Sequence, residues 1–234
     1  LAWWGDDRVT GVAIDSNESI YVTGHTNSYD ILCITFNCGN FPSQTTLGRG
    51  GPRDAFLIRL NPLASGLASL AFATRYGGSG ADTGLSVTVN NAGVAAIAGS
   101  TASNNLFLSN ALQSTLNPGN TSGIAFTDGF IAQIDTNAGS QTAMQRLLFA
   151  SYLGGRNSDI ATSITSDAAG DLFVAGETNS ANFPTRNGAQ VALANSDGGG
   201  SDTWAVRLRP TLGTAALLYG TFLGGNGFYD DHAR

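Results

Sequence analysis

The chain has no lysine, and its 234 residues include only two cysteines, two histidines, six prolines and one methionine. All 11 basic residues are therefore arginines, scattered along the sequence, and against 17 acidic residues they leave a net charge of −6. Without a basic stripe to neutralise phosphates, nucleic-acid binding and docking on an anionic membrane are not expected. Since no run of about 18 apolar residues occurs, we expect no membrane insertion.

Groups that usually perform catalysis are also scarce. The histidines are His25 and His232, and the only glutamates are Glu18 and Glu177. Neither histidine lies in a recognisable triad context. We therefore expect that the protein is not an enzyme. A polysaccharide hydrolase or lyase, the least favoured function, would have to rely on aspartates such as Asp54 with Asp202.

What is abundant is glycine, with 31 residues, together with 42% hydrophobic residues. That profile is typical of short strands joined by turns. One segment recurs three times, at Asp7–Gly24, Asp82–Gly99 and Asp159–Gly176. Each copy is an alternating apolar run, a polar turn and a second alternating run that ends in glycine. This pattern predicts an antiparallel strand pair.

Each copy is followed by two further strand-like runs, so the repeat is a unit of four strands. An Asp opens the third run and a Gly pair closes the fourth. In the third copy the runs are predicted at about 160–166, 171–176, 202–209 and 215–223. The period of roughly 70–77 residues matches one supersecondary unit. We predict an all-β chain with little helix, made of β-propeller blades; a β-solenoid is the distant alternative.

The repeat markers divide the chain into three blades and two stubs. We predict the end of a preceding blade at 1–6, blades at 7–78, 79–155 and 156–225, and the start of a following blade at 226–234. Three blades leave apolar sheet faces uncovered, whereas closed propellers have about four to eight blades. The expected partners are therefore further blades of the same longer chain, or a second copy that closes the ring.

The residues at 20–28, IYVTGHTNS, and at 172–180, LFVAGETNS, each lie upstream of a Phe-Pro pair, Phe41-Pro42 and Phe183-Pro184. With the Asp-Ala-Phe at 54–56 and the Tyr-Leu-Gly-Gly at 152–155, they make the chain resemble the bacterial SBBP propeller repeats. The resemblance implies a secreted or cell-surface protein, but no single activity and no catalytic residues. The second copy lacks Phe-Pro, so we expect its long loop to follow another path.

The connections between the second and third runs are long, at about 25–53, 100–127 and 177–201. If strand order follows chain order outward, these loops share one edge with the blade-to-blade crossovers. Long loops on a rigid scaffold are where binding usually occurs. Aromatic residues that could stack on sugar rings or anchor a protein lie in these loops or in the N-terminal stub: Trp3, Trp4, Phe36, Phe107 and Phe126. Phe41 and Phe183 are instead predicted to fold back onto their blades.

Two aspartates per unit are predicted at the same edge: Asp7, Asp82 and Asp159 before the first strand, and Asp54, Asp128 and Asp202 at the start of the third. Together with loop carbonyls they could bind Ca²⁺, and the sequence suggests no other cofactor. The favoured alternative is that each Asp accepts hydrogen bonds from its own turn. The crossover glycines, including Gly77, Gly154 and Gly224, are expected to adopt positive φ; no helix follows them, as phosphate binding would require.

Cys33 and Cys38 are separated by four residues and are predicted to form a disulfide in an oxidising compartment. A thiol metal site with His25 and a pair of free thiols are the alternatives. The expected location is secreted, periplasmic or cell-surface. The favoured function is a module that binds protein or glycan, as in adhesion, through the long-loop edge. The alternative is a structural spacer or assembly module of a larger envelope protein or filament.

Overall fold

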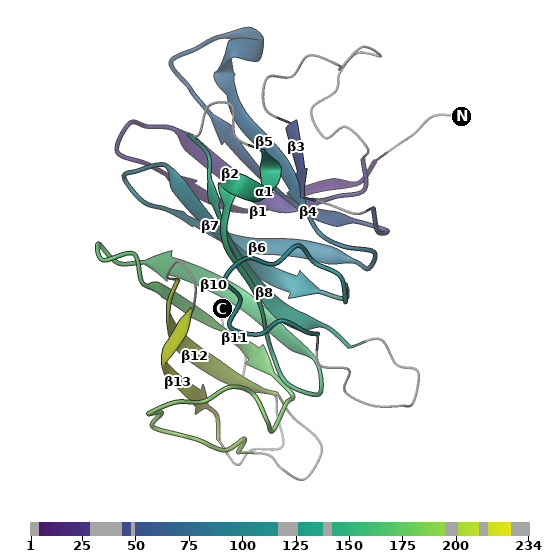
Figure 1. The fold of residues 1–234 in the computed structure, drawn as a ribbon, viewed down its shortest axis with the longest axis vertical. Coiled ribbons are helices and arrows are strands. Elements are labelled where there is room, and N and C mark those ends of the chain that lie inside the picture. Colours follow the sequence, from purple (N-terminus) through teal and green to yellow (C-terminus); the bar gives the residue numbers. More distant parts are fainter. Residues whose placement is uncertain are drawn as a thin grey trace.

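The computed structural model describes residues 5–28, 44–47, 50–116, 126–137, 142–194, 201–210 and 215–225. Within them the chain forms three antiparallel four-strand units, stacked one after another along the long axis of the molecule (Figure 1). The predicted all-β class and the four-strand repeat are therefore confirmed. The sheets do not close into a ring.

Each sheet is one blade, and its strands come from one stretch of chain. Blade 1 contains β1 (Asp7–Ile14), β2 (Ile20–Thr26), β4 (Asp54–Leu60) and β5 (Leu70–Tyr76), with the short β3 (Gln44–Leu47) at its edge. Blade 2 contains β6 (Asp82–Val89), β7 (Val94–Thr101), β8 (Asp128–Asp135) and β9 (Leu147–Leu153). Blade 3 contains β10 (Asp159–Ser166), β11 (Leu172–Thr178), β12 (Asp202–Arg209) and β13 (Ala216–Leu223).

Within every blade the four main strands lie in chain order and pair antiparallel. Each pairing of first and second strands has an irregularity at the same place, as between Gly84 and Ser86 in blade 2 and between Ala161 and Ser163 in blade 3. Such β-bulges increase the local twist of a strand. The three copies thus share detailed register as well as strand count.

The polar turns between first and second strands fold as predicted. In each blade one side-chain oxygen accepts hydrogen bonds from backbone N–H groups two and four residues later, at 2.9–3.0 Å. The accepting residues are Asp15, Asn90 and Asp167. Gly93 and Gly170, in the second and third of these turns, have positive φ, as such turns require.

In the described residues the helical content is two short segments. A 3₁₀ turn, Gly66–Ser69, precedes β5, and the helix α1, Ala143–Arg146, precedes β9. Both lie in connections between third and fourth strands, at the edge of the blades opposite the long loops. In the part of the chain that the structure describes, neither helix is long and apolar enough to cross a membrane.

Blade 2 is packed on both faces. One apolar cluster joins it to blade 1 and includes Tyr21, Leu57 and Phe72 of blade 1 with Ile97 and Phe130 of blade 2. A second cluster joins its other face to blade 3. We call the face of a blade that contacts the preceding blade its front face, and the face that contacts the following blade its back face. The alternation of side chains along each strand supplies both faces.

Candidate functional site

The long connections and the crossovers emerge at one edge of the sheets, which we call the loop edge. It is marked by a row of three residues in each blade, paired across neighbouring strands. In blade 2 the row is Asp82, Thr101 and Asp128. The equivalent rows are Asp7, Thr26 and Asp54 in blade 1 and Asp159, Thr178 and Asp202 in blade 3. The six predicted aspartates therefore share this edge.

The first aspartate of each row is held by hydroxyl groups. Asp159 accepts hydrogen bonds from the Thr178 hydroxyl, from the Ser180 hydroxyl at 2.8 Å and from the Gly155 N–H at 2.6 Å. Asp82 accepts equivalent bonds from Thr101, Ser103 and Gly78. Asp7 accepts from Thr26 and Ser28. The Thr-x-Ser element thus fastens the end of the second strand to the start of the first. The predicted N–H donors from the turn of each Asp are present as Gly78 for Asp82 and Gly155 for Asp159.

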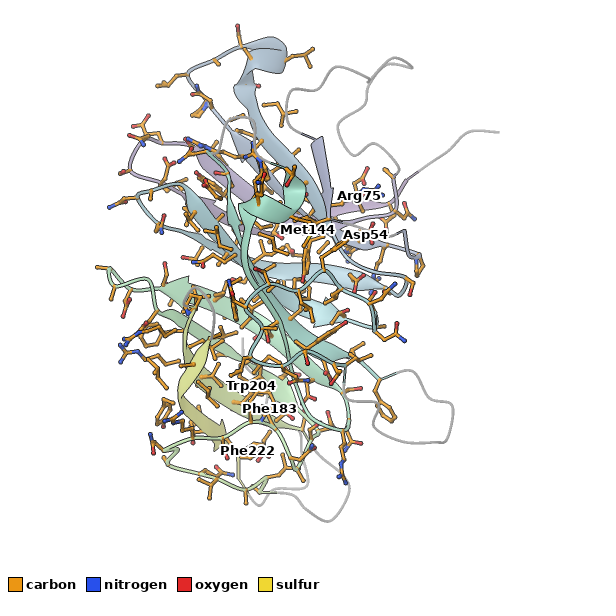
Figure 2. All side chains as sticks on the ribbon, viewed as in Figure 1. Asp54, Arg75, Met144, Phe183, Trp204 and Phe222 are labelled. Carbon is orange, nitrogen blue, oxygen red and sulfur yellow. The ribbon has the colours of Figure 1, made fainter. Side chains whose placement is uncertain are left out.

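The third-strand aspartates Asp54, Asp128 and Asp202 are buried, and their partners are not the Thr-x-Ser hydroxyls. A glutamine from the long loop reaches two of them: Gln113 Nε2 donates to Asp128 Oδ2 at 3.1 Å, and Gln190 Nε2 donates to Asp202 Oδ2 at 3.4 Å. In blade 1 Asp54 Oδ2 instead lies 3.5 Å from Arg75 Nη1, an ion pair visible in Figure 2. The sequence reasoning missed the two glutamines, although they occupy equivalent places in successive repeats.

Carboxylates from successive blades approach each other at the crossover glycines. A Cβ built on Gly77 would lie 2.4 Å from Asp54 Oδ1 and 2.7 Å from Asp82 Oδ2. One built on Gly154 would lie 2.6 Å from Asp128 Oδ1 and 2.8 Å from Asp159 Oδ2. The prediction of positive φ here is wrong, because neither glycine is among those with positive φ. Glycine is needed because the paired carboxylates leave no room for a side chain.

Burial changes the titration of these carboxyl groups. Burial, offset by Arg75 and reinforced by the Asp82 charge, raises the pKa of Asp54 to about 6. Burial also raises the pKa of Asp159 to about 6, although hydrogen bonds from Gly155, Thr178 and Ser180 oppose the rise. The pKa of Asp82 is raised for the same reason. A buried carboxyl group favours its neutral form, because burial removes the water that solvates the charge.

The described residues provide each crossover with a carboxylate pair, which falls short of a complete calcium site. Calcium takes six to eight oxygen ligands. No group of three or more His, Cys, Asp or Glu side chains in the described part of the chain is placed to hold a metal ion. Hydroxyl and N–H donors already contact both oxygens of Asp82 and Asp159.

The long loops are fastened to the outer strands of their blades. In blade 1 the strand β3 pairs parallel to β5, a fifth strand that the sequence did not predict. In blade 3 the segment at Arg186 and Asn187 bridges Gly220 of β13. In blade 2 Ser109 bridges Ala150 of β9. Side chains add to these links, as Gln190 Oε1 accepts from the Gly224 N–H at 3.1 Å.

The expected separate path for the loop of blade 2 is wrong over its described part. Gln113 accepts from the Gly154 N–H and contacts Asp128, as Gln190 does with Gly224 and Asp202. Leu106 takes the place of the Phe in the missing Phe-Pro pair and is buried. An aliphatic side chain fills the same site, so the proline is not required.

The structure describes two of the five aromatic candidates. Phe107 and Phe126 are both half-buried, and Phe107 packs against the cluster between blades 1 and 2. Trp3, Trp4 and Phe36 lie outside the described residues, as do Phe41 and the cysteines Cys33 and Cys38. Phe183 folds back onto its blade as predicted, stacked on Trp204 and edge-on to Phe222 (Figure 2).

A second feature, which the sequence reasoning did not locate, is the back face of blade 3. An apolar groove of about 580 Å³ crosses it, lined in part by Phe173, Ala175, Ala205 and Tyr219. Arg207 lies over the Phe173 ring at 5.4 Å. The sequence signal was present, since these residues alternate with the buried positions of β11 and β12.

Two stretches of the chain match a family model described as SBBP, beta-propeller repeat. They are residues 4–31 and 148–184, which cover the first strand pair of blade 1 and the start of blade 3 with the preceding β9. A comparison with curated proteins finds no match.

Proposed function

Because this chain carries SBBP beta-propeller repeats, we propose that it is a binding module that holds a protein or glycan at its loop edge. The observation that carries the proposal is the fastening of long loops to rigid strands. Gln113 and Gln190 each join a long loop to a third-strand aspartate and to a crossover glycine. A pre-ordered loop loses less conformational entropy on binding, so such a surface binds more tightly.

The loop edge offers apolar side chains among polar groups, the combination that suits a sugar ring or a protein anchor. Phe126 is half-buried two residues before β8 begins, and Val191 is 65% exposed directly after Gln190. Binding at the loop edge requires no catalytic group, so the function that we propose is not enzymatic. We place it outside the cytoplasm, secreted, periplasmic or on the cell surface, in keeping with its acidic, lysine-free composition.

The experiment is a screen of the labelled full chain on a glycan array and on an array of extracellular-matrix proteins. Phe126→Ala and Val191→Ser should each weaken a genuine hit by about tenfold, the loss of roughly 1.4 kcal/mol. Leu63→Ala is the matched control, because Leu63 is 80% exposed at the opposite edge, between β4 and β5. A hit that resists both loop substitutions, or that Leu63→Ala weakens equally, would refute the loop edge as the binding surface.

A further inference from the structure

The back faces of the three blades can be compared position by position, because the strand registers are equivalent. Across the second, third and fourth strands, Tyr21, Arg59 and Phe72 align in blade 1. The equivalent row in blade 2 is Ala96, Gln133 and Phe149, and in blade 3 it is Phe173, Arg207 and Tyr219. Any difference in burial along these rows reflects what packs on the face.

The aromatic and alanine members of these rows are buried wherever a following blade is present, whereas Arg59 and Gln133 are partly exposed. Tyr21 and Phe72 of blade 1 are 0% exposed, and Ala96 and Phe149 of blade 2 are 2% and 1% exposed. In blade 3 Phe173 is 38% exposed, Leu223 is 50% exposed and Tyr219 is half-buried. No described residue packs over the groove between them. Blade 3 thus presents an apolar back face that corresponds to the back faces buried in blades 1 and 2.

Blade 1 presents the complementary surface. Val87, on the front face of blade 2, is 7% exposed because it packs against blade 1, and Ile164 of blade 3 is likewise 7% exposed. The equivalent residue of blade 1 is Val12, which is 67% exposed, and Ile14 on the same face is 68% exposed. Among the described residues, the back face of blade 3 and the β1 part of the front face of blade 1 are therefore uncovered, whereas Phe56 and Ile58 on the same front face of blade 1 are buried.

An arginine on the back face shows the same difference between blade 1 and blade 3. Arg59 lies 5.6 Å over the Tyr21 ring and donates a hydrogen bond to Asn137 of the next blade. Arg207 has the same register position over Phe173, and its side chain is 40% exposed. The guanidinium that bridges blades 1 and 2 therefore has a counterpart on the open face of blade 3.

We propose that the back face of blade 3 docks on the front face of blade 1 of a second copy of this chain. The two faces are those that meet inside the chain at both blade junctions, so the contact reuses an established interface. It is head-to-tail, and two copies joined this way at both ends form a ring of six blades, within the usual range for propellers. This contact lies on the sheet faces and is independent of binding at the loop edge.

The test is the mass of the full chain in solution, by light scattering after gel filtration, from micromolar to hundreds of micromolar. We expect twice the 24.0 kDa of one chain. Phe173→Asp, Leu223→Asp and Val12→Asp should each raise the dissociation constant about tenfold or more, since each places a charge in an apolar interface. Leu63→Asp is the control, because Leu63 is more exposed than any of the three and lies on neither face.

A mixing experiment separates the head-to-tail contact from a symmetric one. The Val12→Asp variant keeps an intact blade 3 face, and the Phe173→Asp variant keeps an intact blade 1 face. Mixing the two should restore association, because one intact junction forms between them. Circular dichroism of each variant establishes that it is folded. The proposal is overturned by a single-chain mass at the highest concentration, by an oligomer that ignores Val12→Asp, or by a mixture that stays dissociated.

Discussion

Phe183 stacks on Trp204 with ring centroids 4.6 Å apart and an interplanar angle of 29°. Phe183 comes from the long loop of blade 3 and Trp204 from β12, so this contact fixes the loop to its own sheet. Both rings are almost fully buried, at 3% and 0% exposed. Offset-stacked pairs of this kind stabilise beyond the area they bury. The stability of blade 3 is therefore expected to depend on the loop residue.

Phe183→Ala should lower the free energy of unfolding by about 3–5 kcal/mol, the usual range for removing a buried Phe. The cause is the cavity left against Trp204 and Phe222. Denaturant unfolding followed by tryptophan fluorescence measures the change. The matched control is Val191→Ala in the same loop, which is 65% exposed and should change stability by less than about 0.5 kcal/mol. A loss below about 1 kcal/mol for Phe183→Ala would contradict the account.

Thr178→Val should destabilise the chain by about 1–3 kcal/mol, because it removes the hydroxyl that donates to Asp159. The same oxygen accepts from the Ser180 N–H at 2.9 Å, so one substitution breaks two bonds of the fastening. Thr178→Ser keeps the hydroxyl and should recover most of the loss. Thermal unfolding of the two variants beside the parent chain provides the comparison; equal losses would show that the methyl group, and not the hydroxyl, matters.

Asp54→Asn should stabilise the chain at neutral pH by about 1–2 kcal/mol, because it removes a charge that burial disfavours. The folded pKa of Asp54 is raised to about 6, above the ordinary 3.8. The stabilising contribution of the protonated Asp54 carboxyl group is therefore complete below pH 3.8 and is lost as the pH rises through 6. The gap between variant and parent should open across that window and vanish near pH 3. Chemical denaturation at a series of pH values tests this; a gap independent of pH would contradict it.

Asp171→Asn should behave in the opposite way. Hydrogen bonds from Arg209, then from Arg207, lower the pKa of Asp171 below 3.8. Its contribution is therefore present above pH 3.8 and is lost as the pH falls through the lowered folded value. The variant should be less stable than the parent chain at pH 7 and should approach it in acid. Leu63→Ala, a substitution at an exposed position without a titratable group, is the control. Unfolding at pH 7 and in strong acid decides the sign.

Local pattern was sufficient for the strands and for part of the loop edge. The alternation and the turn residues located the strands of blade 3 within one or two residues of their observed ends. They did so because successive side chains of a strand point to opposite faces of the sheet. The recurring Asp positions also share one edge, as their repetition suggested. Gln113 and Gln190 were not predicted, because the contacts of a loop glutamine form only when the loop folds back onto the outer strand.

The sequence alone determined the repeat, the positions of the strands and the polar turns, because these depend on neighbours along the chain. The tertiary structure decided which faces are covered. Phe149 and Tyr219 occupy the same register position in equivalent strands, yet Phe149 is 1% exposed and Tyr219 is half-buried. The difference arises because a following blade packs on Phe149 and not on Tyr219. The local sequence pattern of a strand does not indicate whether another blade covers it.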